Sequence, residues 1–229
     1  FMNTQILKNK IQDDEILNNI ASFFPNKIYL VGGSVRDCFL GKDTFDRDLI
    51  VTDEDAGIFS QKVSEFFDGK FIPLDEENKI YRVVLKDKKN YLDITNPIEN
   101  SIEKDLFRRD LTINAIAVDI KSGEILDLVG GVKDIQSKTI RGIKDFNFED
   151  DPLRILRVFR FYSILGFEID SHLLEVVKKL KDSVLQPAKE RIEYELMKLF
   201  EGKYADSALL KMDECEILNK LFPFVDELK

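Results

Sequence analysis

Two carboxylates, Asp46 and Asp48, stand two residues apart at the start of an apolar run that reads as a strand. Alternate residues of a strand face the same way, so these side chains share one face and repel each other unless a cation lies between them. Hard oxygen ligands of this kind suit Mg²⁺, which leads us to expect a magnesium site here. A solvated strand start is the alternative, since a bare Asp-x-Asp pattern is common.

A third carboxylate and a glycine pair strengthen this expectation. Asp93 lies in "NYLDIT", a second expected strand that could neighbour the first, and such a set can hold two metal ions for an in-line displacement. Gly32 and Gly33, followed by Arg36, form a turn whose backbone N–H groups could approach a triphosphate. The alternatives are an inert Asp93 and an ordinary tight turn.

The segment "RRDLTINAIAVD" carries fixed positive charge at Arg108 and Arg109, which suits phosphates. Asp110 and Asn114 are four residues apart and share a face if this segment is helical. A carboxylate and an amide together suit ribose hydroxyls. Otherwise Asp110 is a helix N-cap and Asn114 is structural.

The segment "DDPLRILR" predicts a helix that starts near Pro152. Asp150, Arg154 and Arg157 would form one stripe of this helix, with Asp151 beside it. Carboxylates and guanidinium groups on one face supply the acceptors and donors that read the edge of a base. Ion pairing on a helix surface is an equally good interpretation.

The surrounding patterns predict an α+β fold, with a small mixed β-sheet and flanking helices over residues 1–145 and an all-helical region over residues 146–229. We expect an amphipathic helix over 5–24, a short helix after the glycine pair with Ser34 as its N-cap, and a helix over 54–67. Strands are expected at "KIYLVGG", "DRDLIVT", "YRVVLKD" and "NYLDIT", and no convincing strand follows Asp151.

Composition narrows the chemistry. The chain has 229 residues with 44% hydrophobic and 34% charged residues, which is typical of a folded globular protein. No apolar run approaches the roughly 20 residues of a membrane helix, and we expect a cytoplasmic protein with no membrane partner.

Cys38 and Cys215 lie far apart, as expected of reduced apolar fillers, and the single histidine, His172, is expected at the surface. The net charge of −9 argues mildly against nucleic-acid binding, although local fields decide where a polyanion docks.

Taken in order, five motifs resemble the class II tRNA nucleotidyltransferases and bacterial poly(A) polymerases of the DNA polymerase β-like superfamily. They are "LVGGSVRDCFLG…DRDLIV", "DLFRRDLTINAIAVD", "DLVGGVKDIQSKTIR", "DDPLRILRVFRF" and "KERIEYELMKLF". The resemblance implies a nucleotidyltransferase head and a helical neck with the start of a body. It also implies a template-independent enzyme that uses Mg²⁺ and CTP or ATP to extend the 3′ end of tRNA or another RNA.

The resemblance also implies roles for residues. The metal ligands would be Asp46 and Asp48, with Asp93 as the third catalytic carboxylate. The residues implied to bind the nucleotide are Gly32, Gly33 and Arg36 (triphosphate), Arg109, Asp110 and Asn114 (phosphate and ribose), and Asp150, Asp151, Arg154 and Arg157 (base).

Two departures from the family pattern bear on the product. Asp150 stands where the family has Glu, which puts base reading in question. The segment "ITNPIENSIEKDLF" is short where CCA-adding members carry a long flexible loop, which resembles the CC-adding enzymes. A poly(A)-type or A-adding enzyme is the alternative, and a non-catalytic nucleotide- or RNA-binding module or a truncated fragment is a further one.

Overall fold

The computed structural model describes residues 2–42 and 45–223. The chain forms two compact units. The first comprises Phe1–Phe107 with Ile113–Ile135, and the second comprises Arg108–Thr112 with Gln136–Lys229. The domain boundary expected between residues 145 and 146 stays a prediction.

The first unit is built on a seven-stranded sheet with the strand order β3-β4-β5-β2-β1-β6-β7. Its strands are β1 (Ile28–Val31), β2 (Asp46–Val51), β3 (Lys70–Asp75), β4 (Ile80–Val84), β5 (Tyr91–Thr95), β6 (Ala117–Asp119) and β7 (Ile125–Leu126). Strands β2 and β5 pair in parallel and the other pairs are antiparallel. The mixed sheet and the α+β class are therefore confirmed, while β3, β6 and β7 were not expected.

Helices flank this sheet. They are α1 (Met2–Asp13), α2 (Glu15–Phe23), α3 (Gly33–Phe39), α4 (Ala56–Phe66), α5 (Ile102–Phe107) and α6 (Gly131–Ser137), with short 3₁₀ turns at Ile98–Asn100 and Thr112–Asn114. The single helix expected over 5–24 is in fact two, because Asp14 caps α2 by accepting hydrogen bonds from the N–H groups of Ile16 and Leu17. An N-cap of this kind starts a helix afresh and ends the one before it.

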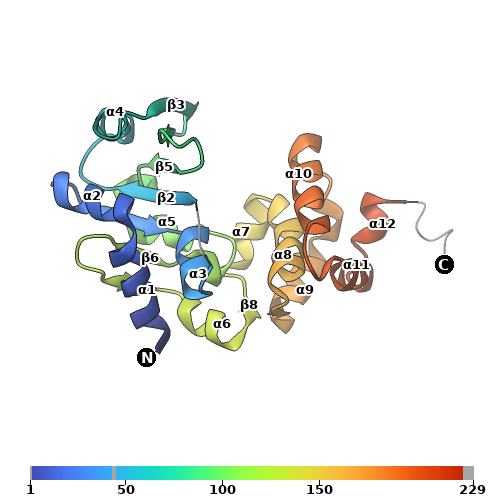
Figure 1. Cartoon of the computed structure of the whole chain (residues 1–229). Coiled ribbons are helices and arrows are strands. Elements are labelled where there is room, and N and C mark those ends of the chain that lie inside the picture. Colours follow the sequence, from blue (N-terminus) through green and yellow to red (C-terminus); the bar gives the residue numbers. More distant parts are fainter. Residues whose placement is uncertain (1, 43–44, 224–229) are drawn as a thin grey trace. The chain divides into compact units, whose positions relative to one another are not determined.

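The two faces of the sheet differ in burial. Leu49, Val83 and Leu92 point to the face covered by α4 and are fully buried. Figure 1 shows α4 beside β3. Burying each such side chain stabilises the fold by about 1.5–3 kcal/mol. Asp48, Arg82 and Asp93 alternate with these residues, face the other way and are only half-buried, whereas Ile50, further along the same face of β2, is fully buried. One face is thus core, and the other is left open for polar side chains.

The second unit is mainly helical. Its helices are α7 (Asp145–Asp150), α8 (Leu153–Leu165), α9 (Ser171–Lys179), α10 (Lys189–Phe200), α11 (Ala205–Glu214) and α12 (Leu218–Leu221), with a 3₁₀ turn at Lys181–Ser183. The expectation of an all-helical region is wrong in one detail, because β8 (Thr139–Ile140) pairs in parallel with β9 (Glu168–Ile169). Two-residue strands are too short to show a period in the sequence.

Helix α8 packs closely against α10 and α11 in this unit. A Cβ atom on Gly202 would lie 1.9 Å from Ser163 Oγ, so only glycine fits where the chain passes this helix. Ser163 Oγ in turn donates to the Leu199 carbonyl at 2.6 Å, which ties α8 to the end of α10. These contacts fix the helix that carries the arginines described below.

The remaining small predictions hold. Cys38 and Cys215 are buried thiols without a disulfide, and burial raises the pKa of Cys38 to about 11. His172 is a surface side chain beside Asp145, with its Nε2 2.9 Å from Asp145 Oδ1. Across the described ranges, no helix combines the length and the apolar character needed to cross a membrane.

Candidate active site

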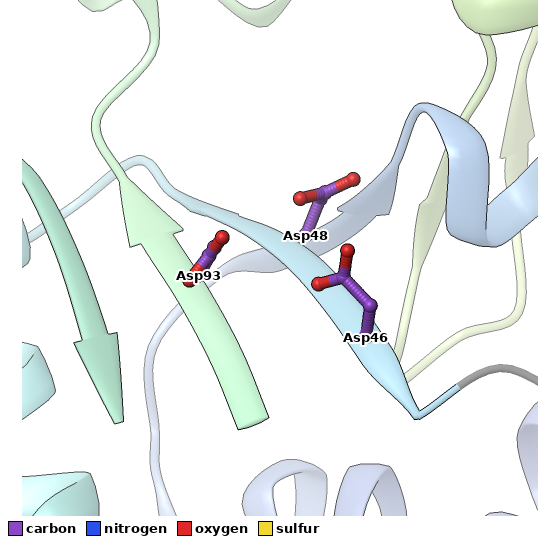
Figure 2. A group of neighbouring side chains, drawn as sticks. All are labelled: Asp46, Asp48 and Asp93. Carbon is purple, nitrogen blue, oxygen red and sulfur yellow. The ribbon is translucent and has the colours of Figure 1, made fainter. Parts of the chain in front are cut away.

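Three carboxylates meet on the open face of the sheet. Asp46 and Asp48 come from β2 and Asp93 from β5, and Asp48 pairs with Asp93 in the parallel register. One oxygen of each lies within 4.8 Å of the other two. Figure 2 shows the three side chains rising from neighbouring strands toward one another. The sequence prediction that β2 and the Asp93 strand are neighbours is confirmed.

The electrostatics of this cluster suit a cation. Burial, and then the negative charge of Asp93, raise the pKa of Asp46 above its usual value. A carboxylate in this position is costly to keep ionised without positive charge nearby. Three half-buried carboxylate oxygens this close are the donor set that a hard divalent cation takes, so the residues fit such an ion.

The turn after β1 is tied to the strand that bears the aspartates. Gly32 is the N-cap of α3 and has φ 71°, a conformation that glycine adopts at little cost. The expected capping role of Ser34 is wrong, because its side chain is used elsewhere. Ser34 Oγ donates to the Asp46 carbonyl at 3.1 Å and accepts from the Asp48 N–H at 3.2 Å. The start of α3 and the two aspartates are therefore held in a fixed relation.

Arg36 and Asn114 lie together in the first unit. Arg36 Nη1 donates to Asn114 Oδ1 at 2.6 Å, and Nε and Nη2 donate to the Asp37 carboxylate at 3.0 Å. Both Arg36 and Asn114 are buried. The glycine turn, Arg36 and Asn114 form a single constellation, although Arg36 and Asn114 are 78 residues apart in the sequence.

Sequence reasoning missed Arg82 of β4. It pairs across the antiparallel register with Asp93 and donates two hydrogen bonds, from Nε and Nη2, each at 2.7 Å. The guanidinium also lies 4.2 Å from the centroid of the Tyr91 ring, and the Asp93 carboxylate raises the pKa of Arg82. Tyr91 in turn hydrogen-bonds to Asp46. No local motif marks Arg82, because its role depends on strand register.

Arg47 lies on the opposite face of β2, between the two aspartates, and was also missed. It is buried and forms an ion pair with Asp14 at 2.8 Å. Its Nη1 donates to Asn90 Oδ1 at 2.9 Å. These partners lie before α2 and at the start of β5, so Arg47 links three segments. They border a cavity of about 470 Å³.

In the second unit, Asp110 is tied to α8. Arg157 Nε donates to Asp110 Oδ2 at 2.6 Å, and the carboxyl is only 5% exposed. Glu195 of α10 lies 3.7 Å from Arg157 and 3.1 Å from Arg160. Burial lowers the pKa of Arg157, but the nearby carboxylates, Asp110 foremost and then Glu195 and Asp151, together raise it above its usual value.

The expectation that Asp110 and Asn114 share a helical face is wrong. The backbone between them is a β-bridge of Leu111 to Gly142 followed by the 3₁₀ turn Thr112–Asn114, not an α-helix. Asp110 contacts Arg157, whereas Asn114 contacts Arg36 in the first unit. The four-residue spacing suggested a helix, but the backbone at Leu111 pairs with Gly142 and does not form helical hydrogen bonds.

The prediction that Asp150, Arg154 and Arg157 form one stripe of a single helix is also wrong in part. Asp150 is the last residue of α7, and α8 begins only at Leu153, so the chain bends between them. Proline lacks the N–H that would continue α7 through this point. The expected cap is partly found, since Asp151 Oδ1 accepts from the Leu153 N–H at 3.3 Å.

The candidate base-reading side chains have partners of their own. Asp151 pairs with Arg191 of α10 at 3.0 Å. Arg154 Nη1 donates to the Asn147 carbonyl at 2.9 Å, and burial lowers the pKa of Arg154. Asn147 Nδ2 donates to the Arg109 carbonyl at 2.7 Å, so α7 links the backbone of Arg109 to the start of α8.

Two family models match the chain. The model described as "Poly A polymerase head domain" matches residues 28–141, and the one described as "Probable RNA and SrmB- binding site of polymerase A" matches residues 166–229. The first match contains the three carboxylates, the glycine turn and Asn114. Arg191 and Glu195 of the second unit lie within the second match, whereas Asp151, Arg157 and Arg160 lie between the two matched regions.

Curated relatives agree with these matches. The CCA-adding enzyme of Bacillus pumilus is 35% identical over 203 residues, which is 84% of this chain and 50% of that protein. The CC-adding tRNA nucleotidyltransferase of Geobacter sulfurreducens is 35% identical over 194 residues, or 85% and 45%. The chain therefore spans about half the length of the curated relatives it matches.

Solved structures show the same similarity. The Thermotoga maritima CCA-adding enzyme complexed with tRNA superposes with a TM-score of 0.85 and 30% identity, covering 95% of this chain and 55% of that one. A complex of a CCA-adding enzyme with CTP gives a TM-score of 0.85 at 29% identity, with the same coverage.

Proposed function

Because the chain belongs to the family of class II tRNA nucleotidyltransferases and bacterial poly(A) polymerases, we propose that it adds nucleotides to an RNA 3′ end without a template. The observation that carries the proposal is the convergence of Asp46, Asp48 and Asp93 beside the glycine turn. The similar proteins include a CC-adding tRNA nucleotidyltransferase and CCA-adding enzymes solved with tRNA, CTP or ATP, so tRNA is the proposed RNA, with CTP or ATP as the donor. The cytoplasmic location expected from the sequence stays a prediction.

The three carboxylates would hold Mg²⁺, with Asp46 and Asp48 as the principal ligands. Their oxygens lie close together, and burial and then the charge of Asp93 raise the pKa of Asp46, a cost of ionisation that a cation would relieve. When bound, the ion would offset negative charge on the reacting phosphate. Ser34 keeps the two aspartates in register by bonding to the backbone of both.

The reaction we propose is attack of the RNA 3′ hydroxyl oxygen on the α-phosphorus of the nucleotide. A new O–P bond forms, the bond between the α-phosphorus and the pyrophosphate leaving group breaks, and the proton of the hydroxyl passes to solvent water. The Gly32–Gly33 turn and the start of α3 would receive the triphosphate, with Arg36 supplying fixed positive charge. Arg36 is already held by Asn114 and Asp37, so little side-chain freedom is lost on binding.

Recognition of the nucleotide would fall to the second group of residues. Within the second unit, Arg109 and Asp110 would bind phosphate and ribose, and Arg157 would keep Asp110 in place through their 2.6 Å hydrogen bond. Asn114 of the first unit is proposed for the same recognition task.

Base reading is proposed for the start of α8 and the bend before it. The residues are Asp150, Asp151 and Arg154, which together offer carboxylate acceptors and guanidinium donors. Arg157 lies one turn further along α8.

Product length is a separate question. Between β5 and α5 the chain makes only a short connection with the 3₁₀ turn Ile98–Asn100. On the family resemblance, the absence of a long loop in this described segment favours addition of C residues without the terminal A. Full CCA addition and poly(A)-type addition are the other outcomes that the experiment can give.

The test is incubation of the protein with tRNA lacking its CCA end and single nucleotides in Mg²⁺, with products sized on a gel. We expect two C residues to be added from CTP. An Asp48→Asn variant should lose incorporation by at least about 100-fold, the loss that even outer-shell partners of a metal cause. Asp206→Asn, on the exposed face of α11, is the matched control and should keep activity.

Circular dichroism of both variants separates loss of chemistry from loss of fold. Extension with long A tracts would identify a poly(A)-type enzyme. Absence of incorporation, with nucleotide or RNA still bound, would identify a non-catalytic binding module and refute the proposal. Undiminished incorporation by Asp48→Asn would refute the metal assignment.

A further inference from the structure

The open face of the sheet continues from the carboxylates to the edge strand β3. Two cross-strand rows run along it, namely Asp48–Asp93–Arg82–Ile72 and Asp46–Tyr91–Val84–Lys70. Directly paired residues of neighbouring strands point to the same face, so both rows belong to one surface. From β2 to β3 there are three strand spacings, a distance of about 14 Å.

A groove lies at the β3 end of this face. Its volume is about 570 Å³, and it is lined by Gly69, Ile72, Val84, Leu85, Asp68 and three lysines. The lysines are Lys70, Lys86 and Lys88, all exposed. Asp68 is the one carboxylate among the lining residues, and it pairs with Lys86. The groove is therefore positively charged over an apolar lining, in a chain whose net charge is −9.

The proposed reaction indicates on which side of the carboxylates the RNA would lie, and this is the side where the groove is found. In an in-line displacement the attacking and leaving oxygens lie on opposite sides of the phosphorus. The glycine turn, where pyrophosphate would leave, follows β1 on one side of β2, and β5, β4 and β3 lie on the other side. An RNA 3′ hydroxyl therefore approaches over β5, and the nucleotides before it extend toward β3.

We propose that Lys70, Lys86 and Lys88 bind the phosphates of the RNA nucleotides that precede the 3′ terminal one. This inference rests on the proposed function, because it takes the carboxylates as the place of reaction. Phosphate contacts by lysine and arginine supply most of the sequence-independent affinity for nucleic acids. An acidic peptide would also suit the lysines, but the shared rows with the carboxylates favour the RNA that reacts there.

The test compares two triple variants of the protein. In the first, the three groove lysines are replaced by alanine. In the control, Lys62→Ala, Lys121→Ala and Lys133→Ala remove three exposed lysines elsewhere in the same unit. Affinity for tRNA lacking its CCA end is measured by fluorescence anisotropy at several salt concentrations, and KM values for RNA and nucleotide are measured alongside.

We expect the groove variant to bind RNA roughly 10- to 30-fold more weakly, and its slope of log K against log salt to fall by about 2, since each contact to a single strand contributes about 0.7. The KM for RNA should rise while the KM for the nucleotide stays unchanged. The control should match the unmodified protein. All six lysines are exposed, so circular dichroism should report intact folds.

Several results would overturn the inference. One is an unchanged salt slope and RNA KM in the groove variant, or an equal loss in the control. Another is a raised nucleotide KM in place of a raised RNA KM. Lysine-dependent binding of polyglutamate with unaltered RNA affinity would assign the groove to an acidic protein. Lysine-dependent RNA binding by a protein that incorporates no nucleotide would refute the proposed function and support the groove as an RNA site.

Discussion

Removal of Glu195 from the charge cluster of the second unit should destabilise the protein strongly. Glu195 is almost fully buried on α10 and lies 3.1 Å from Arg160 and 3.7 Å from Arg157, both on α8. Burial raises the pKa of Glu195, while the two guanidinium groups oppose this shift. In Glu195→Ala, Arg157 keeps its bond to Asp110, whereas Arg160 loses the carboxylate with which it pairs.

The size of the effect follows from burial. Breaking a buried ion pair by removing one partner costs about 3–5 kcal/mol, because the other charge stays buried without compensation. Arg160 has a side chain only 13% exposed, so water can relieve little of this cost. We expect the lower end, about 3 kcal/mol, because burial already disfavours the ionised form of Glu195. For a chain of this size, that is a fall of roughly 6–12 °C in Tm.

The assay is urea and thermal unfolding followed by helical circular dichroism near neutral pH. Glu195→Gln keeps the volume and removes the charge, and should lose most of the same stability. A second variant, Glu195→Leu with Arg160→Leu, removes both charges and should recover much of it, as buried pairs replaced by apolar side chains often do. A loss below about 1 kcal/mol in Glu195→Ala would refute the reasoning, as would a double variant no more stable than the single one.

Three further predictions concern other parts of the chain. Asp145 raises the pKa of His172, so the pair should stabilise the fold fully below about pH 6.5 and progressively less as the pH rises through the higher folded-state pKa. In Asp145→Asn, the pKa of this single histidine, measured by NMR titration, should fall. Identical titration curves for the variant and the unmodified protein would contradict the prediction. Gly202→Ala would place a Cβ atom against Ser163 and should cost about 1–3 kcal/mol or more in urea unfolding, which an unchanged midpoint would disprove. Arg47→Lys removes the guanidinium group that contacts Asp14 and Asn90 on the face of β2 opposite the two aspartates. We expect kcat for nucleotide incorporation to fall roughly 10- to 100-fold with an unchanged nucleotide KM. A change in KM alone would argue against a positioning role.

The sequence was sufficient for the parts of the site that depend on local spacing. Asp46 and Asp48 share a face because a strand alternates its side chains, and the glycine turn before α3 follows from residue type alone. The order of the five motifs along the chain then carried the resemblance to a family, and the resemblance implied roles for individual residues. These expectations agree with the pairing of Asp48 with Asp93.

The parts that failed depend on contacts between distant segments or on backbone pairing. Asp110 and Asn114 have helical spacing, yet a β-bridge at Leu111 and a 3₁₀ turn separate them. Pro152 was read as the start of one helix that included Asp150, although the chain bends at this proline and leaves Asp150 on α7. Periodicity describes a face only if the backbone stays regular, and it carries no information on where regularity ends.

Arg82 shows why an acidic motif alone is an incomplete description of this site. Two ionised carboxylates whose oxygens lie within 4.8 Å of each other repel by at least about 3 kcal/mol at an effective dielectric constant of 20. The three pairs together approach about 10 kcal/mol, which is comparable to the whole stability of a typical domain. Without a bound cation, something in the fold must therefore offset the charge. Arg82 does so through its two 2.7 Å bonds to Asp93, and the raised pKa of Asp46 makes that carboxyl easier to protonate than an ordinary aspartate. The arginine thus belongs to the site as much as the carboxylates do, because it lets the protein fold with three acids already in position.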